Sequence, residues 1–246
     1  ENKYFKVKID DNGDIAGIYD KTASREVLSK PATLDFQQER PSAWPSWNMD
    51  WKDRKNPPVD YMNKEVTVKV VENGPVRVAL QVTKKGMNSE ISQVISLSAG
   101  EAGKVIEVRN VIDWQSKEVS LKAAFPTKVI NEFATYSLNT AAVRRTTNNE
   151  IKFEVPGRQW IDLTDKSNSY GVSILEDCKY GSDKPDGSTL RLTLMYTPKA
   201  NDFEYQGTQD WGIHNVKYAI YPHSCDWAYE GTPWNLRYKN KPPKAI

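Results

Sequence analysis

The chain has 246 residues, of which 38% are hydrophobic and 27% are charged, so it can bury a core and does not have the composition of a disordered protein. Its 34 basic and 32 acidic side chains leave a formal charge of +2, which is too small to draw in nucleic acid or an anionic membrane surface. No apolar run approaches the length of a membrane span, and two cysteines cannot build a dense disulfide framework or a four-cysteine zinc site.

Alternating apolar and polar residues predict β-strands along nearly the whole chain. The expected strands cover residues 4–9, 15–19, 66–70, 76–82, 91–97, 105–114, 119–125, 134–138, 151–155, 170–175, 190–196 and 216–221. Asp-Asn-Gly at 11–13 and Asn-Gly-Pro at 73–75 are typical turns between neighbouring strands. The stretch 31–61 is rich in Pro and Trp, which predicts an irregular connection.

The fold class follows from these strands, because no segment carries the apolar stripe of an amphipathic helix. We expect an all-β protein, a large antiparallel sandwich of two sheets. A seven-strand immunoglobulin-like sandwich needs only about 100 residues, and no linker-like segment divides this chain. We therefore expect one large domain over residues 1–238, followed by a tail or domain boundary at 239–246.

The segment 153–181 gives the best indication of function. It predicts two short strands joined by a polar turn and ends in the sequence Glu-Asp-Cys-Lys-Tyr-Gly. A strand that ends in packed charged and aromatic groups is a candidate ligand-facing loop in an all-β scaffold, which singles out Asp177, Lys179 and Tyr180. Two alternatives stay open, since such a loop can also dock another domain, and Asp177 can simply pair with Lys179.

A second cluster of interest is the sequence PSAWPSWNMDWKD at 41–53. Trp44, Trp47 and Trp51 stand here beside Asn48 and Asp50. Flat aromatic faces stack on the C–H surfaces of sugars, and polar edge groups bind their hydroxyls. Aromatic residues are also enriched at interfaces, so a sugar site and a wedge between domains are both open readings.

Several classes of reaction centre have no support in the sequence. His214 and His223 are too few and wrongly spaced for a self-contained zinc site, and we expect His223 to make a structural hydrogen bond at a strand end. There is no G-x-S-x-G nucleophile motif and no glycine-rich phosphate loop. Spacing alone cannot locate a pair of catalytic carboxylates among 32 acidic side chains.

The remaining polar residues are expected to be structural. Arg145, Arg158 and Asp162 should form buried pairs within the fold. Cys178 and Cys225 could form one bridge if their strands meet, but we expect two buried free thiols instead. This leaves the cellular compartment open.

Several segments occur in an order typical of one known family. They are ENKYFKVKIDDNGDIAGIYDKTASREVL at 1–28, IEVRNVIDW at 106–114, LKAAFP at 121–126, ATYSLNTAAVRRTT at 134–147, FEVPGRQWIDLTDKSNSYGVSILEDCKYG at 153–181 and YAIYPH at 218–223. Together they resemble the C-terminal β domain of glycoside hydrolase family 38 α-mannosidases, over residues 1 to about 227. Glu176 stands where that family usually has asparagine.

The resemblance implies a very large sandwich, or supersandwich, of the galactose-mutarotase-like kind. It also implies a preceding catalytic domain that carries the zinc ligands and the carboxylate nucleophile of a retaining mechanism. No catalytic or metal-binding residue is then expected in this chain, which should be inactive alone. Its expected partners are that catalytic domain and a mannose-containing glycan, with Asp177, Lys179, Tyr180, Trp44, Trp47 and Asp50 as candidates for the rim of the sugar pocket.

Two other functions stay open beside this accessory domain of a mannoside hydrolase. The first is a stand-alone carbohydrate-binding module that uses the surface formed by Trp44, Trp47 and Trp51. The second is an epimerase-like sugar enzyme that uses His214 and His223, which rests on analogy of fold.

Overall fold

A computed structural model describes residues 1–138, 140–200 and 206–232, so the expected tail at 239–246 lies outside the described residues. The described residues are mostly strand, with a few short helical turns. The strands are β1 (Phe5–Ile9), β2 (Ile15–Asp20), β3 (Arg25–Glu26), β4 (Thr33–Gln38), β5 (Asp60–Tyr61), β6 (Lys64–Asn73), β7 (Arg77–Gly86), β8 (Ser89–Ser98), β9 (Ile106–Trp114), β10 (Val119–Pro126), β11 (Phe133–Ser137), β12 (Ala142–Thr146), β13 (Val155–Pro156), β14 (Trp160–Thr164), β15 (Tyr170–Glu176), β16 (Gly181–Asp183), β17 (Thr189–Thr197) and β18 (Gly212–Ser224). The helical turns are α1 (Trp51–Arg54), η1 (Glu101–Lys104) and η2 (Gln206–Thr208).

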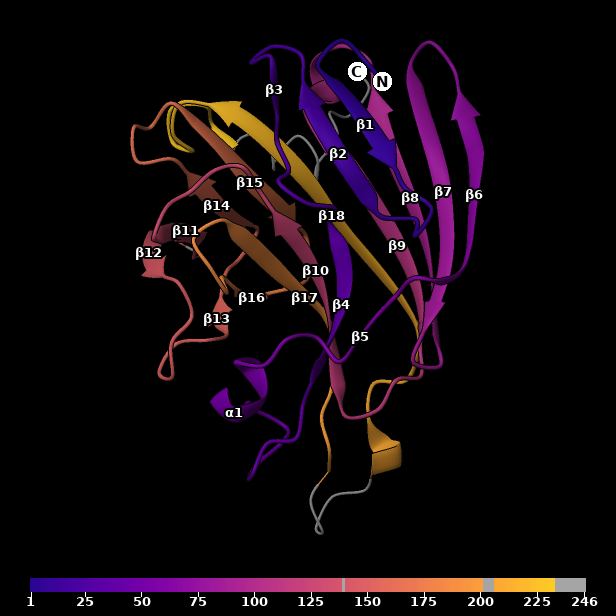
Figure 1. The fold of residues 1–246 in the computed structure, drawn as a ribbon, viewed down its shortest axis with the longest axis vertical. Helices are drawn as coiled ribbons and strands as arrows, with labels where there is room; N and C mark the ends of the chain where they lie inside the picture. Colours follow the sequence, from indigo (N-terminus) through magenta and orange to yellow (C-terminus); the bar gives the residue numbers. More distant parts are fainter. Residues whose placement is uncertain (139, 201–205, 233–246) are drawn as a thin grey trace.

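These strands pair into three antiparallel sheets (Figure 1). The largest sheet has nine strands in the order β12-β11-β14-β15-β18-β9-β8-β7-β6, and the second has six in the order β13-β16-β17-β10-β4-β5. A small third sheet, β1-β2-β3, lies near the N-terminus. The all-β antiparallel sandwich is therefore confirmed, with this small sheet added to the two that the sequence predicts.

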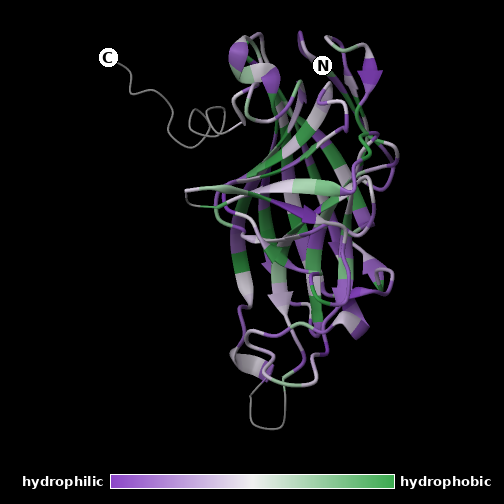
Figure 2. Ribbon diagram, turned by 90° about the vertical axis from the view of Figure 1, so that its left-hand side faces the viewer, coloured by the Kyte–Doolittle hydropathy of each residue, from purple (hydrophilic) through white to green (hydrophobic). Residues whose placement is uncertain are grey.

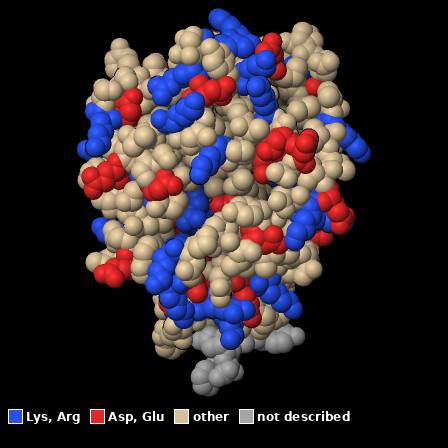
Figure 3. Space-filling view, viewed as in Figure 1, with Lys and Arg blue, Asp and Glu red and all other residues tan. Residues whose placement is uncertain are grey.

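The two large sheets face each other across one hydrophobic core. Phe36 of β4 stacks on Trp114 of β9 with 6.0 Å between ring centroids, and Phe125 of β10 meets Tyr218 of β18 edge-on at 5.5 Å. Each of these pairs joins one sheet to the other. Figure 2 shows hydrophobic residues running along the strands and hydrophilic ones at the tips and loops. Figure 3 shows basic and acidic side chains mixed over one face, in keeping with the small net charge. Within the described residues, no helix is both long and apolar enough to cross a membrane.

Most of the strands expected from alternation are present, and β9 shows why. Its burial alternates almost perfectly, with Ile106, Val108, Ile112 and Trp114 all turned into the core. One expected strand, 151–155, is wrong apart from its last residue, which belongs to β13. The expected irregular stretch 31–61 is also only partly right, since it contains β4 and α1 and ends in β5.

Three strands are covered on both faces and show where the sandwich has further layers. In β10, β14 and β15 nearly every residue is buried, the partly buried Pro126 being the exception. On β14 and β15 the outer face packs against the segment 225–232, where the Trp227 ring lies 4.7 Å from that of Trp160. On β10 the outer face carries Lys122, which contacts Asp183 of β16 and Glu154 before β13, and Arg54 of α1 lies 3.9 Å from the same Glu154. These charged groups form a buried polar layer.

Candidate functional site

The loop before α1 presents two exposed tryptophans. Trp44 and Trp47 are 60% and 74% exposed, and their rings stack with 5.9 Å between centroids and an angle of 8° between planes. The loop is held to β17 because the Tyr196 hydroxyl donates hydrogen bonds to the carbonyls of Pro45 and Asn48, at 3.0 and 2.7 Å. The pair is therefore a fixed, flat aromatic surface open to solvent.

Asp50 shapes the loop that carries these tryptophans. Its carboxylate accepts hydrogen bonds from the Ser42 backbone amide at 2.8 Å and hydroxyl at 2.6 Å, and Lys52 lies 3.1 Å away. The hydrogen bond from the Ser42 hydroxyl outweighs partial burial and holds the pKa of Asp50 below its usual value. The carboxylate is thus ionised and already bonded within its own loop.

The loop between β15 and β16 carries the other expected residues. Asp177 and Tyr180 are exposed and Lys179 is half-buried. The buried carboxylate of Glu176 accepts the backbone amides of Lys179, at 2.8 Å, and of Gln159. Since an asparagine amide offers only one acceptor oxygen, the glutamate found here can fix both strand ends at once.

Arg158 lies over this loop rather than in a buried pair. It is exposed, and its guanidinium carbon is 5.0 Å from the centroid of the Tyr180 ring. The expectation of a buried Arg158 pair is therefore wrong, because the residue follows β13 in a turn whose side chains face solvent. Arg145 is half-buried and lies over the ring of Tyr136. It forms no buried ion pair among the described residues, so this expectation is wrong as well.

One short segment connects the two loops. The Phe153 ring lies 5.6 Å from that of Trp51, and the Gly157 amide donates to the Tyr180 carbonyl at 2.9 Å. Segment 153–157 therefore borders the tryptophan loop at one end and the Tyr180 loop at the other. The sequence-predicted residues therefore come from two loops, one leading into α1 and the other joining β15 to β16, which are linked through segment 153–157.

Beneath this segment lies a buried ion cluster that the sequence analysis missed. The Lys122 ammonium, on β10, is fully buried and donates to Asp183 at 2.7 Å, to Thr193 at 2.8 Å and to Glu154. Arg191 pairs with the same Asp183. The only sequence signal was one lysine inside the otherwise apolar strand SLKAAF.

A second buried pair extends this cluster to α1. Arg54 of α1 pairs with Glu39, and Glu39 also accepts the Ser120 hydroxyl at 2.7 Å. Burial raises the pKa of Glu39 in spite of Arg54. For Asp183, burial alone would raise the pKa, but Lys122 and Arg191 outweigh it and hold the pKa well below its usual value. These charges fix α1 and segment 153–157 on the sheet.

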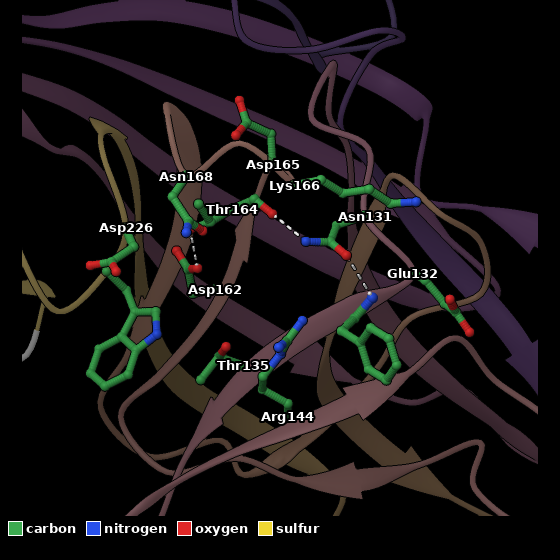
Figure 4. Close-up of a pocket in the computed structure, with 12 residues that line it drawn as sticks. Asn131, Glu132, Thr135, Arg144, Asp162, Thr164, Asp165, Lys166, Asn168 and Asp226 are labelled. Atoms are coloured by element: carbon green, nitrogen blue, oxygen red, sulfur yellow. Dashed lines mark hydrogen bonds between the residues drawn. The ribbon is translucent and has the colours of Figure 1, made fainter.

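A separate polar cavity of about 410 Å³ lies on the outer face of the nine-stranded sheet (Figure 4). Its walls come from β11, β12, β14, the turn 165–168 and Asp226–Trp227. At its floor, the Asp162 carboxylate accepts hydrogen bonds from Thr164 at 2.7 Å and Ser173 at 2.8 Å, and it pairs with His223 at 2.8 Å. Asp162 thus forms the expected buried structural pair, and its lone pairs are used within the fold.

Gly171 makes room for this network. A Cβ atom there would lie 2.4 Å from His223 Cε1 and 2.7 Å from Thr164 Oγ1. Burial alone would lower the pKa of His223, but its contacts with Asp162 outweigh burial and raise the pKa above the usual value. His223 therefore has the structural role that the sequence indicates.

The two histidines do not form one site. Both lie on β18, and their separation along one strand is about 30 Å at roughly 3.3 Å per residue. This geometry rules out a shared reaction centre for His214 and His223. Among the described residues no group of three or more His, Cys, Asp or Glu side chains could hold a metal ion.

The two cysteines are free, and Cys178 is exposed while Cys225 is half-buried, so the expectation of two buried thiols is wrong. Cys178 follows the end of β15, whereas Cys225 follows Ser224, which pairs with the first residue of that strand. They lie at opposite ends of a strand about 20 Å long, too far apart for a disulfide.

The chain is similar to known proteins over most of its length. A family model described as "Glycosyl hydrolases family 38 C-terminal domain" matches residues 1–204. An alpha-mannosidase of Saccharomyces cerevisiae is 32% identical over 95% of this chain and 23% of its own length, and human "Alpha-mannosidase 2C1" is 29% identical over 91% of this chain and 21% of its own. The chain thus spans less than a quarter of these relatives.

Solved structures show the same fold. An alpha-mannosidase from Enterococcus faecalis matches with a TM-score of 0.79 and 17% identity, over 98% of this chain and 31% of that one. A galactose mutarotase related enzyme from Lactobacillus acidophilus matches with a TM-score of 0.53 and 10% identity, over 92% of this chain and 96% of that one. These likenesses support the galactose-mutarotase-like sandwich.

Proposed function

Because the chain belongs to the family of glycosyl hydrolase family 38 C-terminal domains, we propose that it is the accessory β domain of an enzyme that hydrolyses terminal α-mannosides. The match of the family model over residues 1–204 carries this proposal. In the whole enzyme, a preceding catalytic domain supplies the reacting groups, and a retaining mechanism through a glycosyl-enzyme ester is the form of the reaction. Zinc would belong to that domain, since the described residues of this chain offer no site for it.

The role of this chain is to complete the rim of the sugar pocket. The stacked Trp44–Trp47 surface is available either to the C–H face of a mannose unit or to the catalytic domain. Tyr180, under Arg158, adds a phenol hydroxyl at the other end of segment 153–157, and Asp177 and Lys179 add charges of opposite sign there. Such groups orient the ring hydroxyls of the sugar while the reacting groups of the catalytic domain carry out the chemistry.

The buried ion cluster supports this rim physically. Lys122 and Arg54 tie segment 153–157 and α1 to the six-stranded sheet, so the loops stand on a rigid base. Rim residues need such a base, because a displacement of about 1 Å can cost up to 10²-fold in rate.

The proposal is tested in the polypeptide that contains both the catalytic domain and this chain. Trp44→Ala with Trp47→Ala should lower kcat/KM for an aryl α-mannoside by about tenfold, through lost positioning. The matched control is Lys69→Ala on β6, which is exposed and should leave kcat/KM unchanged. An unchanged kcat/KM in the tryptophan variant would contradict the proposal that this chain completes the rim of the sugar pocket.

The exposed tryptophan pair is also the observation that favours the second candidate, a stand-alone carbohydrate-binding module. In that case, mannose should change the tryptophan fluorescence of this chain alone, and Trp47→Ala should abolish the change. We expect no such Trp47-dependent change, because in an accessory domain the Trp44–Trp47 pair acts only together with the catalytic domain.

A further inference from the structure

The cavity on the outer face of the nine-stranded sheet lies away from the rim. It borders the turn between β14 and β15, whereas the Tyr180 loop follows the other end of β15, about 20 Å along the strand. No residue of the rim lines it. A ligand held here would therefore occupy a second site.

Strand register brings the cavity's polar side chains together. Thr135 of β11 pairs with Arg144 of β12 on one side and with Asp162 of β14 on the other, so all three stand on one face. Figure 4 shows Arg144, Thr135 and Asn131 reaching into the cavity from different directions, while Glu132 and Lys166 point toward its edge. The sheet thus supplies a rigid floor for groups that converge.

Several of these groups keep their hydrogen-bonding capacity. The Arg144 guanidinium lies over the Phe133 ring, 4.9 Å from its centroid, and the side chains of Arg144, Thr135 and Asn168 make no hydrogen bond within the described residues. Asn131 uses one amide hydrogen on the Thr164 carbonyl at 2.8 Å and keeps the other. Within the described ranges, donors and acceptors therefore stand side by side without hydrogen-bond partners.

The mixture of groups selects the chemistry of a ligand. The lining holds the basic residues Arg144 and Lys166 and four acidic ones, Glu132, Asp162, Asp165 and Asp226, of which Asp162 is paired with His223. This mixture disfavours an anionic ligand, and no group of acidic side chains among the described residues could hold a metal ion. Neighbouring hydroxyls, each both donor and acceptor, match such a mixture. The rings of Phe133 and Trp227 in the walls offer faces for C–H surfaces, and the volume suits one sugar ring.

We propose that this cavity is a second carbohydrate site, which binds one hexopyranose unit of a glycan through Arg144, Thr135, Asn168 and the Trp227 ring. It would hold a glycan arm away from the reaction centre. Only the choice of mannose as the first probe rests on the proposed function.

The test is a residue-resolved NMR titration of the full 246-residue chain with methyl α-mannoside and, separately, methyl α-glucoside. We expect saturable shifts of the Arg144 Nε–H, Asn168 amide and Trp227 indole signals, with a Kd on the order of 1 mM for a ligand of this size. Arg144→Ala should weaken binding about five- to tenfold, through loss of a charged donor. Asn168→Gly should do the same without strain, because Asn168 has a positive φ of 54° that glycine adopts freely.

The matched control is Arg109→Ala, an exposed arginine on β9 of the same sheet, which should leave the titration unchanged. Binding of either glycoside at these signals supports the proposal. The proposal is overturned by absent shifts with both glycosides, by an equal response to glycerol, or by unchanged affinity in both cavity variants. The role of the rim is tested by the hydrolysis rate of the two-domain polypeptide, whereas the cavity is tested by the NMR titration of this chain. Failure of one proposal can therefore be told apart from failure of the other.

Discussion

Replacing Lys122 with methionine tests whether the buried ion cluster holds the rim in place. Methionine keeps the length and apolar stem of lysine but removes the ammonium, which donates to Asp183, Thr193 and Glu154. Lys122 and Asp183 are both fully buried, so water cannot replace these bonds. The variant therefore leaves carboxylates with fewer partners in a dry environment.

The expected loss follows from what each partner keeps. Removing one member of a buried ion pair typically costs about 3–5 kcal/mol. Asp183 keeps Arg191 and the amide of Asn148, and Glu154 is 14% exposed and keeps Thr193. These remaining contacts put the loss at the lower end, about 3 kcal/mol, which corresponds to roughly 1–2 M in the urea midpoint.

Urea unfolding followed by circular dichroism measures this loss in the full chain. Lys69→Met, on the exposed face of β6, is the matched control and should change stability by less than about 0.5 kcal/mol. In a Glu154→Gln background, Lys122→Met should lower the free energy of unfolding by about 1 kcal/mol less, because the Glu154 carboxylate is no longer left without its lysine partner. If Lys122→Met lowers the midpoint no more than Lys69→Met, the cluster does not constrain the fold as argued.

Three further predictions concern the network beside the cavity and the free thiol. Gly171→Ala should destabilise the chain by about 2–3 kcal/mol in urea unfolding, because its Cβ would displace the buried His223 ring; a neutral effect would show that the ring has room. Since Asp162 raises the pKa of His223, its stabilising contact should be complete below about pH 6.5 and fade as the pH rises through the folded pKa. The stability gap between wild type and His223→Gln should then narrow between pH 6 and 9, and a widening gap would contradict the assignment. Partial desolvation of the sulfur, together with the neighbouring Asp177, raises the pKa of the Cys178 thiol to about 11. Its alkylation by iodoacetamide should therefore be slow at pH 7 and should rise about tenfold per pH unit, and fast labelling at pH 7 would refute this.

A strand could be predicted from the sequence when one of its faces meets solvent and the other meets the core. Where this is so, as in β9, alternation gives the strand and its core residues. In β4, Asp35 and Gln37 stand at positions that look solvent-facing but are buried, which hides the strand. The opposite error occurs at 151–155, where Ile151 alternates with Phe153 yet is 82% exposed, in a turn that pairs with no strand of the described part of the chain.

The site was predictable only in its local parts. The tryptophan cluster and the Tyr180 loop are short motifs that a sequence displays directly. Which tryptophans stay exposed is set by contacts from distant residues, such as Phe153 against Trp51 and Tyr196 under the loop. The same is true of Lys122, whose partner Asp183 lies 61 residues further along the chain.

The most direct test of the account is the rate at which the purified chain alone hydrolyses an aryl α-mannoside, with and without a chelator. We expect no hydrolysis above the buffer rate, because the reacting groups are assigned to a neighbouring domain. Turnover by this chain that survives the chelator would contradict the account.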